Sequence, residues 1–173
     1  MKLMLKRYGA FVLTLFAVTG CSASPEEMQT NLDRTVFSVK ANNSHWEFLA
    51  DGVSDPKSAL FCAQTVAYAP KAGWTPKAND CAARLSDLEH AAIETLSVAD
   101  SFKQSSNDEF ISDLRMAISP VAKSSFTKNC EPSVANELLT KGKSACVAST
   151  IQISDSVVPM MNFRNKWGSF YNQ

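Results

Sequence analysis

The 173-residue chain has no surplus of basic charge, because 17 lysine and arginine residues balance 17 aspartate and glutamate residues. A nucleic-acid-binding surface needs clustered basic residues, so that class of protein is not predicted. The sequence has only two histidines, no Cys-x-x-Cys and no Gly-x-Ser-x-Gly. A thiol redox centre and an α/β-hydrolase nucleophile therefore lack their sequence signatures.

A complete phosphate-binding loop is missing as well. The segment Gly142-Lys143-Ser144 ends like such a loop, but the glycine that should open the loop is replaced by Glu137. No segment after residue 20 reaches the ~18 consecutive apolar residues of a transmembrane helix. With these patterns missing, neither an enzyme nor a membrane-spanning protein is predicted.

The N-terminus has the layout of a secretory signal. Lys2, Lys6 and Arg7 precede the apolar stretch Gly9 to Val18, which is too short to cross a bilayer comfortably. Small residues then lead into a cysteine, in the order Val18-Thr19-Gly20-Cys21. Export to an oxidising compartment follows from this layout.

Residues 1–21 resemble the lipobox signal of bacterial lipoproteins. The resemblance implies that the Cys21 thiol carries diacylglycerol, that cleavage precedes Cys21, and that the new amino group is acylated too. Ser22 in place of aspartate is compatible with transport to the outer membrane. The resemblance thus implies a lipid-anchored envelope protein, most often held at the outer membrane and facing the periplasm.

This layout divides the chain into three parts. Residues 1–20 are the predicted signal peptide, residues 21–25 the lipidated cysteine with a short tether, and residues 26–173 a single periplasmic domain. The 153 residues from Cys21 onward suit one domain with a substantial core. They carry 14 basic and 17 acidic residues, so no polybasic membrane patch is expected.

Four cysteines remain in the exported part: Cys62, Cys81, Cys130 and Cys146. An even number in an oxidising compartment indicates disulfides, and four cysteines allow three pairings. The local pairs, Cys62 with Cys81 and Cys130 with Cys146, are favoured because each would staple a helix–loop–helix connection. Zinc is disfavoured because its ligands usually come in closely spaced pairs.

The pattern of the remaining residues predicts a mainly α fold, a small bundle of about four to six helices stapled by two disulfides. Ser24-Pro25-Glu26-Glu27 and Thr75-Pro76 are helix starts, and Ser106 to Glu109 fits a capping box. Residues 35–39 could be a short strand or the end of the first helix. Residues 40–57 look like a connection, and Val134 with Leu138 and Leu139 forms a short apolar face.

Two groups of side chains are candidates for function. Asp87, His90 and Glu94 share one face of a predicted helix, where carboxylates and an imidazole could ligate a metal, although ordinary solvated pairing is the favoured interpretation. On the same helix, Glu89 is expected to face water. The C-terminal rings could cover the core, form an exposed patch for a partner or lie in the headgroup layer; they are Phe163, Trp167, Phe170 and Tyr171.

The function predicted from the sequence is a non-enzymatic binding or assembly module for a protein of the bacterial envelope. A chaperone or pilotin-like role, an exclusion role and an immunity role are all compatible with it. No cofactor is predicted. The alternative is a periplasmic metal-binding protein or enzyme centred on Asp87, His90 and Glu94.

Overall fold

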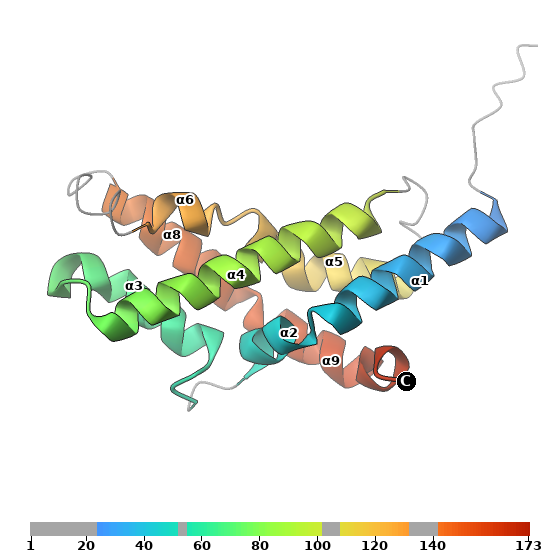
Figure 1. The fold of residues 1–173 in the computed structure, drawn as a ribbon, viewed down its shortest axis with the longest axis horizontal. Helices are drawn as coiled ribbons and strands as arrows, with labels where there is room; N and C mark the ends of the chain where they lie inside the picture. Colours follow the sequence, from blue (N-terminus) through green and yellow to red (C-terminus); the bar gives the residue numbers. More distant parts are fainter. Residues whose placement is uncertain (1–23, 52–54, 102–107, 132–141) are drawn as a thin grey trace, which may run out of the picture.

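The computed structural model describes residues 24–51, 55–101, 108–131 and 142–173. Every regular element within these ranges is an α-helix (Figure 1). Six helices have 14 residues or more, and α2 and α6 are shorter. The prediction of a mainly α, disulfide-stapled bundle is confirmed. The helices are α1 (Pro25–Ala41), α2 (Asn43–Ala50), α3 (Ala59–Ala72), α4 (Pro76–Ala99), α5 (Glu109–Ala122), α6 (Phe126–Asn129), α8 (Gly142–Asp155) and α9 (Val157–Tyr171).

Short polar side chains start four of these helices. Ser24 and Glu27 form a complete capping box ahead of α1, with Pro25 in the first helical position. Thr75 caps α4 as the sequence predicted, by accepting a hydrogen bond from the backbone N–H of Ala78, and Pro76 takes the first helical position. Ser58 caps α3 and Asp108 caps α5, and each accepts a hydrogen bond from a backbone N–H three residues on.

Helix α4 runs along the long axis of the molecule and packs against most of the other helices (Figure 1). It contacts α3 and α6 through its N-terminal half and α1 and α5 further along, while α9 packs against α5 and α2. The core between these helices is fully buried at Trp46, Leu85, Leu114 and Ile118. Helix α4 therefore contacts the helices at both ends of the bundle.

The strand considered for residues 35–39 does not form, because these residues are the last turns of α1. Thr35 and Val39 are buried, so their β-branched side chains face neighbouring helices instead of a sheet. The predicted connection 40–57 contains α2, whose Trp46 is buried and donates its indole N–H to the carbonyl oxygen of Val39 at 2.9 Å. In both segments, packing against other helices therefore determines the secondary structure.

Two helices contain a proline near their C-terminal end. Pro70 belongs to α3 and Pro120 to α5, each in the last turn. The predicted cap at Ser106, the apolar face of Val134, Leu138 and Leu139, and the signal with Cys21 all lie outside the described residues. Within the described residues, no helix is long and apolar enough to cross a membrane.

Candidate partner-binding surfaces

Cys62, Cys81, Cys130 and Cys146 are buried in two disulfides. Cys62–Cys81 joins α3 to the first turns of α4, and Cys130–Cys146 joins the end of α6 to α8. Both are the local pairs that the sequence favoured, so this prediction is confirmed. The bonds fix the elements around one half of α4.

Asp87, His90 and Glu94 are exposed on α4. Among the residues that the structure describes, no three histidine, cysteine, aspartate or glutamate side chains are grouped so that they could hold a metal ion. The geometry of these three side chains is that of a solvated helix face. Glu94 does reach a groove, which is described below.

Glu89 does not face water as expected from the sequence, because it is only 4% exposed. Its carboxylate accepts hydrogen bonds from the backbone N–H groups of Phe126 and Thr127 at 2.7 and 2.8 Å, and from the hydroxyls of Ser124 and Thr127 at 3.1 and 2.6 Å. The two backbone N–H groups belong to the first turn of α6, whose own N-cap residue, Ser125, makes no side-chain capping bond. Glu89 therefore supplies the missing cap from another helix.

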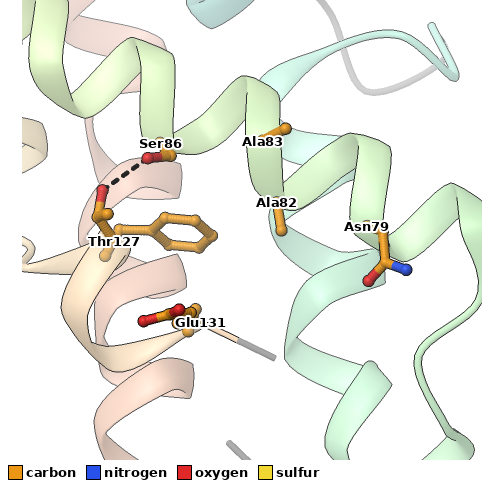
Figure 2. Close-up of a pocket in the computed structure, with 8 residues that line it drawn as sticks. Asn79, Ala82, Ala83, Ser86, Thr127 and Glu131 are labelled. Atoms are coloured by element: carbon orange, nitrogen blue, oxygen red, sulfur yellow. Dashed lines mark hydrogen bonds between the residues drawn. The ribbon is translucent and has the colours of Figure 1, made fainter. Parts of the chain in front are cut away.

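Next to Glu89, α4 and α6 line an open pocket of about 390 Å³ (Figure 2). Ala82, Ala83 and Phe126 give it an apolar wall, and the hydroxyls of Ser86 and Thr127 are hydrogen-bonded to each other at 2.8 Å. Thr127 and the nearby Glu89 carboxylate are hydrogen-bonded to each other as well, so these polar groups already have partners within the protein.

A larger groove of about 450 Å³ runs between α1 and α4. Phe37 stands at this groove and is 73% exposed, the largest value among the described large apolar side chains. Ala41 and Val98 add apolar surface, and Arg34 and Glu94 bring charge. Aromatic side chains are enriched among the hot spots of protein interfaces, so this groove is a candidate partner-binding surface.

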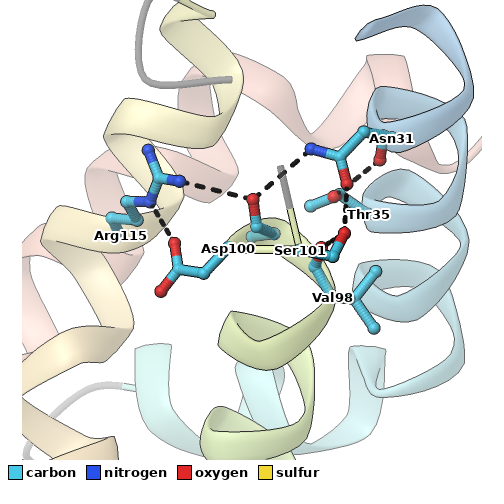
Figure 3. A network of polar contacts seen from close by, with 7 residues as sticks. Asn31, Thr35, Val98, Asp100, Ser101 and Arg115 are labelled. Atoms are coloured by element: carbon cyan, nitrogen blue, oxygen red, sulfur yellow. Dashed lines mark hydrogen bonds and ion pairs between the residues drawn. The ribbon is translucent and has the colours of Figure 1, made fainter. Parts of the chain in front are cut away.

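Polar contacts hold α1 and α4 in place around this groove. The hydroxyls of Ser38 and Thr95 lie 3.0 Å apart, and Asn42 donates to Thr95 at 3.4 Å. Toward the other end of α1, the amide of Asn31 donates to the carbonyl oxygen of Ala99 at 3.4 Å and accepts from the Ser101 hydroxyl at 3.0 Å (Figure 3). The groove is therefore preformed.

Helix α5 joins the same network (Figure 3). Arg115 donates to the Asp100 carboxylate at 2.7 Å and to the carbonyl oxygen of Ala99 at 3.3 Å. The C-terminal end of α4 thereby receives a cation and two hydrogen bonds, which suits the negative end of its dipole. Three helices are fixed relative to one another by this cluster.

The C-terminal rings divide between core and surface. Phe163 and Tyr171 are buried and stacked at 5.9 Å between ring centroids, so neither can meet a partner without rearrangement. Trp167 is half-buried, packs edge-on against Phe110, and donates its indole N–H to Asp113 at 2.9 Å. Only Phe170, 45% exposed, presents a ring to solvent.

A third groove lies between α3 and α8. Its floor is made of small side chains, Ala63, Ala67 and Thr150, and Tyr68 and Ile151 beside it are 68% and 54% exposed. Neither this groove nor the one at Phe37 was predicted from the sequence. Both depend on which helices meet, and periodicity within a single helix does not contain that information.

No family model, curated protein or solved structure matches the chain. The functional argument therefore rests on the surfaces described above.

Proposed function

We propose that the chain is a lipid-anchored periplasmic protein that acts as a non-enzymatic binding or assembly module for an envelope protein. The observation that carries the proposal is Phe37, a largely exposed ring beside the preformed groove between α1 and α4. Exposed aromatic side chains on a rigid surface lose little conformational entropy on binding and are common hot spots of protein interfaces.

The compartment is inferred from two independent features. The two buried disulfides suit an oxidising environment such as the periplasm. The resemblance of residues 1–21 to a lipobox signal supports acylation of Cys21 and stable anchoring, since more than one acyl chain is needed for that. Ser22 in place of aspartate is compatible with an anchor in the outer membrane.

The partner would be a protein segment with an apolar face and mixed charge. The groove offers Phe37, Ala41 and Val98 to apolar side chains, while Arg34 and Glu94 could pair with charges of either sign. This chemistry fits a chaperone-like, exclusion or immunity role, each of which needs one binding surface and no reactive centre.

The test is a crosslinking pull-down of the anchored protein from membranes of the bacterium that produces it, followed by mass spectrometry. Phe37→Ala is compared with Met116→Ala, a matched control because Met116 is another exposed apolar residue on a different helix. Neither substitution should change stability by more than ~0.5 kcal/mol. Trp167→Ala is a poorer probe because it also breaks the hydrogen bond to Asp113.

We expect one stoichiometric envelope protein with the wild type and with Met116→Ala, and its loss with Phe37→Ala. Retention of that protein by Phe37→Ala, or equal loss with both variants, would contradict the assignment of the groove. Lipid anchoring is tested separately. Cys21→Ala should move the protein from the membrane fraction to the soluble fraction.

A further inference from the structure

The position of the predicted lipid defines one end of the molecule. Helix α1 begins at Pro25, four residues after Cys21, and four extended residues span at most ~14 Å. An acylated Cys21 would therefore hold the first turn of α1 within about that distance of the bilayer. We call this end of the bundle the anchor end.

Three other helix termini lie toward the same end of the long axis, and the first turns of α1 reach beyond them (Figure 1). Helix α4 runs antiparallel to α1, because Asn31 contacts Ala99 and Ser38 contacts Thr95, so α4 ends beside the first turns of α1. Helix α5 begins in the same region, and its Glu109 pairs with Lys166 near the end of α9 at 2.5 Å. The anchor end thus combines two helix starts and two helix ends.

Phe170, on the last turns of α9, is the exposed aromatic side chain of this region. Its ring packs edge-on against Phe110 at 5.5 Å and Trp167 at 5.9 Å, so it is supported from beneath and keeps its outer face in solvent. Met28, in the first turns of α1, is exposed as well. Aromatic rings and flanking apolar side chains of this kind are suited to the headgroup layer of a membrane.

The charges of the anchor end decide which lipids it can approach. Glu26, Glu27 and Glu109 are exposed there, and Lys166 is already paired with Glu109 and Asp113. An acidic surface is repelled by anionic headgroups, and attraction to those needs clustered lysine and arginine. We therefore expect the anchor end to approach zwitterionic phospholipids more readily than anionic ones.

From these observations we infer that the anchor end rests on a zwitterionic phospholipid surface, with Phe170 and Met28 at the headgroup layer. The inference depends on the anchoring of Cys21 proposed above. Phe37 lies 12 residues beyond Pro25 on α1, which is about 18 Å further along the helix. The groove at Phe37 therefore lies away from the first turn of α1.

The experiment uses the full lipidated protein, purified from its bacterium and reconstituted in phosphatidylcholine vesicles. A photo-crosslinking side chain replaces Phe170 or, as the matched control, Tyr68, an exposed aromatic residue of α3 near the opposite end of α4. Lipid adducts are measured by mass spectrometry after illumination. The mass of the N-terminal peptide shows independently whether Cys21 is acylated.

We expect a lipid adduct yield several-fold higher at position 170 than at position 68, and a lower yield at 170 when an anionic phospholipid is added. Equal yields at the two positions with Cys21 acylated would overturn the inference and leave the anchor intact. In native membranes, a protein adduct in place of lipid at position 170 would overturn it too, by identifying a partner there. An unmodified Cys21 would remove the proposed anchor and this inference together, whereas the binding role of the groove at Phe37 is decided by the pull-down alone.

Discussion

The carboxylate of Glu89 makes its contribution to stability by capping α6 from α4. Glu89→Ala removes the acceptor of the Thr127 backbone N–H and leaves the Phe126 N–H only its longer bond to the Ser124 hydroxyl, at 3.3 Å, so we expect a loss of about 1–3 kcal/mol in the free energy of unfolding. Urea denaturation of the purified domain measures it. Glu94→Ala is the control: Glu94 is an exposed glutamate on the same helix, and the expected change is within ~0.5 kcal/mol. Similar losses in both variants would contradict the capping role.

Asp113 should make stability depend on acid pH. A hydrogen bond from Lys166, and next one from Trp167, lowers the pKa of the Asp113 carboxyl. A lowered folded-state pKa means that ionised Asp113 stabilises the fold above the ordinary value of ~3.9, and that this contribution is lost as pH falls through the folded-state pKa.

For this carboxyl the test is Asp113→Asn, which keeps an acceptor for the Trp167 indole. Because the pair is near the surface and Lys166 retains Glu109, we expect a difference from the wild type below ~1 kcal/mol at neutral pH. That difference should shrink toward zero as pH falls from ~5 to ~2. Thermal unfolding across this range measures it, and a pH-independent difference would show that packing, and not ionisation, is responsible.

At the residue scale, the sequence predicted that a residue lies on a helix better than it predicted whether its side chain is buried. Glu94 and Glu89 are both glutamates on the same amphipathic helix, and the helical pattern expected both in water. Burial of Glu89 depends on the backbone turn at residues 124–127, which comes from a distant part of the chain. Long-range pairing of this kind leaves no trace in local periodicity.

At the scale of the helices, each disulfide links one pair. Cys62–Cys81 closes α3 on α4 across 19 positions, and Cys130–Cys146 closes α6 on α8 across 16. Replacing both cysteines of either pair with alanine should cost about 3 kcal/mol, mainly by giving the unfolded chain more freedom. Chemical denaturation without reductant measures the loss. Non-reducing peptide mapping of the wild type checks the pairing, and any peptide that links Cys62 to Cys130 or Cys146 would contradict it.

Element boundaries were predictable where a side chain caps the backbone locally. Ser24 with Glu27, and Thr75 with Pro76, could be read directly because the cap and its helix are adjacent in sequence. Helix α2 was missed because Asn42 and Asn43 look like turn residues, and what fixes α2 is the burial of Trp46. Disulfide pairing was predictable because both loops are short.

At the scale of the whole molecule, the described helices form a bundle whose ends differ. The disulfides lie toward the N-terminal half of α4, and the network of Asn31, Asp100 and Arg115 ties the C-terminal end of α4 (Figure 3). The first end is held covalently and the second by polar contacts. A domain with both ends fixed in this way should fold without the N-terminal signal.

That expectation can be tested with two shortened chains secreted into an oxidising compartment. The capping bonds of α1 are made by residues 24–28 themselves, so residues 24–173 should give a mainly helical circular dichroism spectrum and one cooperative thermal transition. The chain of residues 26–173 lacks Ser24 and Pro25 and therefore cannot form the capping box. Loss of such a cap costs about 1 kcal/mol, which for a domain of this size lowers Tm by about 2–4 °C. Identical Tm values for the two chains would mean that the cap contributes nothing to the fold, and failure of residues 24–173 to fold would mean that the preceding segment is part of the domain.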